Sequence, residues 1–63
     1  MTSDDAIEFC DTLLRHFASS LTEWEDTFVR DLQAQLARGR PLSSKQADVL
    51  DRLMTSKARG YGR

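Results

Sequence analysis

Apolar residues recur at steps of three and four along most of the chain, the spacing of an α-helix with one buried face. The first such stripe comprises Ala6, Cys10, Leu13, Leu14, Phe17, Ala18 and Leu21. The second comprises Trp24, Phe28, Leu32 and Leu36, widened by Val29. The third comprises Leu50, Leu53 and Met54, with Val49 at its edge. No alternating β pattern occurs, so the sequence predicts an all-α fold, a compact three-helix domain with helices near 4–19, 22–38 and 43–58.

Capping residues support the second and third helices. Thr22 and Glu25 have the spacing of a capping box, and Ser43 and Gln46 repeat it. Oppositely charged residues four apart add support to every helix. These pairs are Asp11 with Arg15, Asp26 with Arg30, and Asp48 with Arg52.

The stretch 38–41 reads Arg-Gly-Arg-Pro, which is also the core of the AT-hook, a peptide that binds the minor groove of DNA. Gly39 suits the left-handed position just past a helix end, and Pro41 cannot continue the second helix. An AT-hook lies extended in a flexible basic context, whereas amphipathic helices flank this segment. We therefore interpret it as a corner that folds helices two and three into a hairpin. The first helix packs over this hairpin or pairs with its copy in a second chain.

The length of 63 residues allows one domain, which we place at 1–58, followed by a flexible basic tail at 59–63. A chain this small has a marginal core. Its single cysteine excludes an internal disulfide, and one His with one Cys lacks the ligands for structural zinc. We therefore expect no metal or cofactor, and a homodimer is one way to add stability.

Charge is divided unevenly along the chain. Residues 1–31 contain eight acids and two bases, whereas residues 32–63 contain two acids and seven bases. This division indicates intramolecular attraction, association between chains or a basic binding face. The acidic start and the single cysteine favour the cytoplasm, and no apolar run is long enough to span a membrane.

The residues needed for catalysis are poorly represented. Cys10 and His16 are six positions apart, which places them on opposite sides of a helix. Paired carboxylates occur in first helical turns, where the helix dipole explains them. With no glycine-rich phosphate loop, we expect neither an enzyme nor a small-molecule substrate.

The basic residues of the second half form the candidate site. Lys45, Arg52 and Arg59 recur every seven positions, so they share one edge of the third helix. Arg38 and Arg40 lie in the loop beside this edge. Lys57 and Arg63 extend the positive charge toward the tail, as expected of a surface that contacts phosphates. Tyr61 in the tail could stack on a base. This pattern predicts contact with nucleic acid or an acidic protein. Solvated charge that complements an acidic neighbour explains the same pattern, and Asp48 lies close to this edge. The turn between the second and third predicted helices is longer than the turn of a usual helix-turn-helix DNA-binding motif.

A resemblance adds to this interpretation. The string from Leu21 to Leu53 resembles a helical segment of the form L-[ST]-x-W-E-x-x-F-[VI]-x-x-[IL] followed by G-R-x-L-[ST]-x-K-Q-x-x-x-L-x-x-[IL]. Such segments occur in small bacterial and phage proteins and within or beside helicase-type and other DNA-processing proteins. The matching residues are Leu21, Thr22, Trp24, Glu25, Phe28, Val29, Leu32, Gly39, Arg40, Leu42, Ser43, Lys45, Gln46, Leu50 and Leu53. The resemblance implies a recurring helical module, sometimes in nucleic-acid contexts, and no enzymatic activity.

These observations predict a non-enzymatic accessory or interaction protein. Its basic edge, formed by Arg38, Arg40, Lys45, Arg52 and Arg59, would contact nucleic acid or an acidic partner. The alternative is a protein-binding or self-associating helical module with no affinity for nucleic acid.

Overall fold

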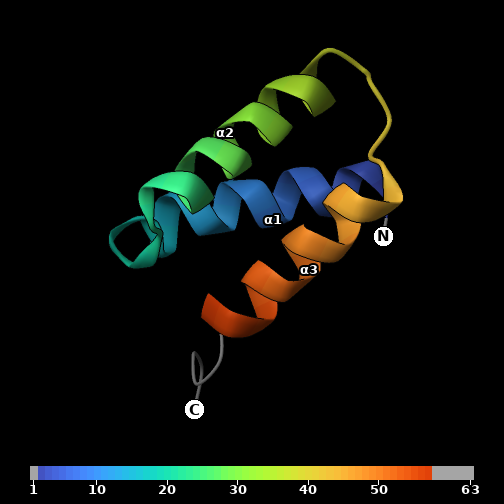
Figure 1. Ribbon diagram of the computed structural model, residues 1–63. Helices are drawn as coiled ribbons and strands as arrows, with labels where there is room; N and C mark the ends of the chain where they lie inside the picture. The colour runs from blue at the N-terminus through green and yellow to red at the C-terminus, as the bar shows by residue number, and fades with distance from the viewer. Residues whose placement is uncertain (1, 58–63) are drawn as a thin grey trace.

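The computed structural model describes residues 2–57, which form three α-helices and one short 3-10 turn (Figure 1). The helices are α1 (Ser3–His16), α2 (Glu23–Ala37) and α3 (Ser44–Lys57), and the 3-10 turn η1 (Ala18–Ser20) joins α1 to α2. The all-α, three-helix fold expected from the sequence is therefore confirmed. Residue 58, the tail at 59–63 and the site residue Arg59 lie outside the described residues.

The first helix differs from its predicted bounds at both ends. It begins one residue earlier, because the hydroxyl of Thr2 accepts a hydrogen bond of 3.1 Å from the Asp5 backbone N–H. It ends at His16, because Phe17 leaves the helical conformation with φ −125° and ψ 15°. Ala18 was expected in the apolar stripe, but this prediction was wrong. The change of backbone direction in η1 leaves Ala18 exposed.

The helices are arranged around α1, which packs against both α2 and α3. Figure 1 shows α1 between the other two helices, with α3 running back alongside it after the α2–α3 corner. The backbones of α2 and α3 approach each other less closely than either approaches α1. The expected hairpin of α2 and α3 is therefore held through α1 and through side chains at its two ends.

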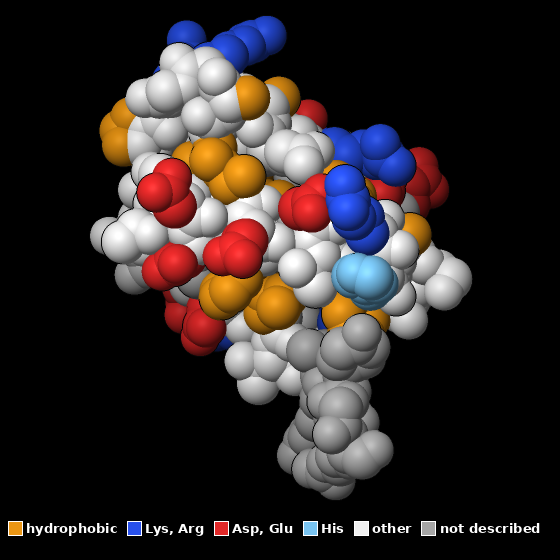
Figure 2. Space-filling view, turned by 180° about the vertical axis from the view of Figure 1, so that it is seen from behind, with side chains coloured by type: hydrophobic (Ala, Val, Ile, Leu, Met, Phe, Trp, Pro, Cys, Tyr) orange, Lys and Arg blue, Asp and Glu red, His pale blue; other side chains and the backbone are white. Residues whose placement is uncertain are grey.

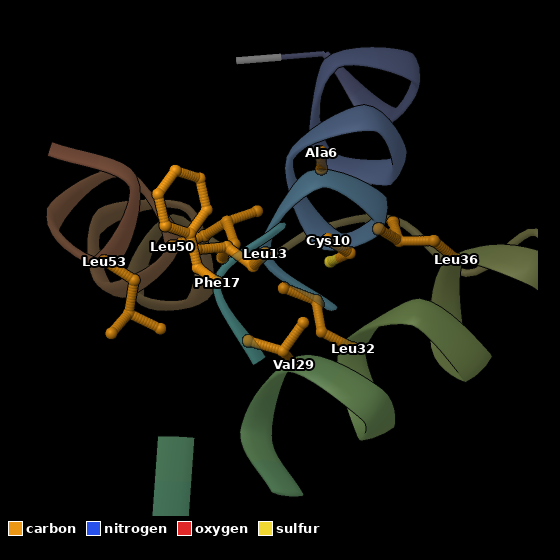
Figure 3. Close-up of a cluster of buried hydrophobic side chains, with 9 residues drawn as sticks. All are labelled: Ala6, Cys10, Leu13, Phe17, Val29, Leu32, Leu36, Leu50 and Leu53. Carbon is orange, nitrogen blue, oxygen red and sulfur yellow. The ribbon is translucent and has the colours of Figure 1, made fainter. Parts of the chain in front are cut away.

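The core lies where the three helices face one another (Figure 3). Each helix contributes from one face, as the apolar spacing requires. The buried residues are Ala6, Cys10, Leu13, Phe17, Val29, Leu32, Leu36, Leu50 and Leu53. Among residues 2–57 no polar or charged residue belongs to this buried set, and no helix there has the length and apolarity needed to cross a membrane.

Candidate interaction surfaces

The corner between α2 and α3 is held by backbone hydrogen bonds. Gly39 has φ +80°, which lets the chain turn out of α2. The N–H of Gly39 donates to the Leu36 carbonyl at 3.0 Å, and the N–H of Arg40 donates to the Gln35 carbonyl at 3.2 Å. These two bonds form a Schellman motif, which satisfies carbonyl groups at the end of α2. The Arg-Gly-Arg-Pro sequence thus ends α2 and opens the loop to α3.

The start of α3 is attached to the end of α2. Ser43 Oγ accepts from the Gln46 N–H, and Gln46 Oε1 accepts from the Ser43 N–H, both at 3.1 Å, which confirms the expected capping box. The side-chain amides of Gln46 and Gln35 also donate to each other at 2.9 Å. Gln35 Nε2 donates further to the Pro41 carbonyl at 3.0 Å. These bonds position the corner and the basic side chains on it.

Three basic side chains surround this corner, namely Arg38, Arg40 and Lys45. Arg38 is the residue that closes α2, Arg40 follows the left-handed glycine, and Lys45 is in the first turn of α3. All three are exposed, and none forms an ion pair with any other residue between 2 and 57. We call these three residues the basic corner. Because no carboxylate in residues 2–57 neutralises them, their charge is available to an external anion.

The remaining predicted site residues differ from the basic corner. Arg52 Nη2 lies 3.1 Å from Asp48 Oδ2, so a carboxylate one turn earlier neutralises this part of the expected edge. Lys57 was expected to extend the positive charge toward the tail, but this prediction was wrong. Its ammonium group turns inward, 3.0 Å from Glu25 Oε1 and 2.8 Å from the Ser20 carbonyl oxygen, and only 18% of the side chain is exposed.

The other basic residues of α1 and α2 are also paired. Arg15 Nε lies 3.1 Å from Asp11, and Arg30 Nε lies 2.9 Å from Asp26, as the four-residue spacing predicted. Acidic side chains gather on the face of α1 shown in Figure 2, with basic side chains toward its margins. Within residues 2–57, positive charge without an ion pair is therefore concentrated at the basic corner.

An aromatic pair lies at the opposite end of α2 from the basic corner. Trp24 is 63% exposed. The apolar spacing put it on the stripe of α2, but its position at the start of the helix was expected to let only part of it bury. Its ring stacks on Phe28, with ring centroids 5.5 Å apart and an interplanar angle of 9°. Position in the first turn of α2 explains the exposure, since the core packs against later turns. The sequence indicated this partial exposure, because the start of a helix has core contacts on one side only.

The groups considered for catalysis lie apart from one another. Cys10 is buried, and burial raises the pKa of its thiol to about 11, so it is protonated at neutral pH. His16 is exposed at the end of α1. Among residues 2–57, no group of three or more His, Cys, Asp and Glu residues is placed to hold a metal ion.

Comparison with known proteins gives no relative: no family model, no curated protein and no solved structure matches this chain. The resemblance to segments of DNA-processing proteins therefore stays a prediction.

Proposed function

We propose that this chain is a non-enzymatic interaction module whose basic corner contacts nucleic acid through its phosphates. One observation carries the proposal. Four of the basic residues in 2–57 are paired with carboxylates, whereas the three without such a partner lie within eight residues on one corner. Arg40 and Lys45 also belong to the sequence pattern whose resemblance implies a module that is sometimes in nucleic-acid contexts. Exposed cations with no internal carboxylate retain the long-range field that attracts phosphates.

The assay is fluorescence anisotropy with labelled single- and double-stranded DNA and RNA of mixed sequence across a salt series. Contact with about three phosphates gives a slope of log affinity against log salt of roughly −2 to −3. Replacing Arg38, Arg40 and Lys45 together by alanine should abolish most of this dependence. Arg15→Ala is the matched control, because it also removes an arginine, from an ion pair distant from the corner. Absence of binding at low salt, or equal loss in the control, would refute the proposal.

Substitution of Arg52 distinguishes a contact limited to the basic corner from one that extends along the wider basic edge expected from the sequence. If Asp48 neutralises it, Arg52→Ala should weaken binding less than Arg40→Ala does. Equal losses of affinity in the two variants would show that the contact continues along α3.

A second candidate function is a cytoplasmic protein-binding module with no affinity for nucleic acid. The exposed Trp24, which stacks on the half-buried Phe28, favours it, because aromatic residues are enriched at protein interfaces. Affinity purification from native lysate, with and without nuclease, separates the two candidates. Retention of the same protein partners after nuclease favours this candidate, and their loss favours the basic corner.

A further inference from the structure

A groove lies between α1 and α2, lined only by residues of these two helices. Its apolar part consists of Ile7, Ala34 and Ala37, and Arg30 and Gln33 complete its lining. Ile7 is 39% exposed, and both alanines are exposed. Figure 2 shows apolar side chains open to solvent among acidic ones on the face behind the view of Figure 1. The small alanine side chains leave room for another side chain against α2.

Charged residues of opposite sign lie beside the two walls of this groove. On α1, Asp4 precedes Ile7 by three residues and Asp11 follows it by four, so both carboxylates share its side of the helix. On α2, Arg30 and Arg38 lie four residues before and after Ala34, and so share its side. Asp11 and Arg30 are each paired within their own helix, so the charges beside the apolar strip that have no ion pair within residues 2–57 are Asp4 on the α1 side and Arg38 on the α2 side.

The order of these charges along the groove makes the face self-complementary. Helices α1 and α2 run in opposite directions (Figure 1), and Ile7 lines the same groove as Ala34 and Ala37. Asp4 is therefore at the same end of the groove as Arg38, while Asp11 is at the end of Arg30. A two-fold axis along the groove brings the α1 wall of each copy opposite the α2 wall of the other.

We propose that a second copy of this chain covers the α1–α2 groove in a symmetric dimer. Ile7 of each copy packs on Ala34 and Ala37 of the other. Asp4 pairs with Arg38 of the second copy, and neither residue has an ion pair within residues 2–57. Asp11 and Arg30 add a second contact, because their internal pairs are solvent-exposed and can accept a further partner.

A dimer of this kind must cover a sizeable share of each copy's surface. A specific interface buries at least about 1,000 Å² in total, so each copy contributes about 500 Å². The accessible surface of the chain is 4527 Å², of which this share is roughly one ninth. This inference does not rest on nucleic-acid binding. Arg38 takes part in both proposals, since the second copy and a nucleic acid would each contact it.

The first test is sedimentation equilibrium of the full chain from micromolar to millimolar concentration, at low salt and without nucleic acid. We expect a reversible dimer that weakens as salt screens the charges at the groove rims. A strict monomer throughout this range would overturn the proposal. The proposed nucleic-acid contact would be unaffected by that result, since it is measured separately.

Variants test the surface itself. Ala34→Glu puts a carboxylate into the groove and opposes the acidic α1 wall, so the dimer dissociation constant should rise at least about tenfold. Thr55→Glu adds the same charge at an exposed position on α3, outside the groove, and should leave dimerisation unchanged. Circular dichroism melts confirm that both variants remain helical. A dimer equally stable in both would place the interface elsewhere.

A charge exchange tests the symmetry. Asp4→Arg and Arg38→Asp should each weaken the dimer, because each places like charges opposite one another across the interface. The double variant restores opposite charges at both equivalent contacts, so it should dimerise more tightly than either single variant. Additive weakening in the double variant would exclude the Asp4–Arg38 contact, and with it the proposed axis.

Discussion

The ammonium group of Lys57 lies 3.0 Å from Glu25 Oε1, which joins the last residue of α3 to the first turn of α2. Glu25 already serves the capping box of α2, where it accepts the Thr22 N–H at 2.8 Å. Lys57 also donates to the Ser20 carbonyl at 2.8 Å. One carboxylate therefore couples the start of α2 to the end of a helix that packs mainly on α1.

We expect Lys57→Met to lower the free energy of unfolding by about 0.5–1.5 kcal/mol, because it removes a mostly buried ion pair and a hydrogen bond. Methionine keeps much of the apolar stem. Arg52→Met is the control, since it removes an ion pair whose side chains are exposed and should cost less than about 0.5 kcal/mol. Urea denaturation followed by circular dichroism measures both. Equal costs would mean that the Lys57 contact adds nothing beyond a surface pair.

Stability should depend on the ionisation of Glu25. The hydrogen bond from the Thr22 N–H and the contact with Lys57 lower the pKa of Glu25 below its usual value of 4.5. The stabilisation is therefore fully present above pH 4.5 and is lost as the pH falls through the lower pKa of the folded state. In Glu25→Gln this part of the acid dependence should disappear. Denaturation series at several acidic pH values compare the free energy of unfolding of the variant with that of the original chain. The same dependence of this free energy on pH in both proteins would contradict the assignment.

The amide pair of Gln35 and Gln46 should stabilise the corner. Gln46→Ala removes both this pair and half of the α3 capping box, so we expect a loss of about 1–2 kcal/mol. Gln46→Glu keeps an acceptor for the Ser43 N–H and places negative charge at the helix start, so its loss should be smaller. Thermal denaturation ranks the variants. A Gln46→Ala variant as stable as the original chain would show that neither the amide pair nor this half of the capping box adds stability.

Gly39 should be sensitive to substitution for a backbone reason. A Cβ built at this position meets no atom within 4 Å, so packing adds no cost. The φ of +80° is unfavourable for residues with a Cβ, and Gly39→Ala should cost about 1 kcal/mol. Gly39→Asn should cost less, because asparagine tolerates the left-handed region better. Chemical denaturation of both variants checks this, and a neutral alanine variant would argue against the left-handed turn.

The Cys10 thiol should react slowly in the folded protein. Burial raises its pKa to about 11, so the reactive thiolate is scarce at neutral pH and solvent access is blocked. Iodoacetamide labelling, followed by mass spectrometry, should accelerate sharply in denaturing urea. Rapid labelling of the native chain would contradict the packing of α1. The same shift implies that the contribution of Cys10 to stability is lost as the pH rises above its usual pKa of 9.0 and through about 11.

Local rules in the sequence account for most of the fold. The capping boxes at Thr22 and Ser43 and the left-handed turn at Gly39 were predicted and are present, because each depends on neighbours within a few residues. The three ion pairs four residues apart follow from helix geometry for the same reason. Cys10 lies in the core because it shares the phase of the apolar stripe.

Some features of the candidate surfaces depended on contacts between residues far apart in the sequence. Helical spacing put Lys57 with the outward charges, whereas the packing of α3 on α1 brought it beside Glu25, thirty-two positions earlier. The pairing of Gln35 with Gln46, eleven positions apart, arose in the same way. Sequence periodicity determined which face of each helix is apolar, because this depends only on local rise and rotation. The pairing of Lys57 with Glu25, and which apolar side chains remain open, were decided by how the helices pack, because packing sets the distances between residues far apart in the chain.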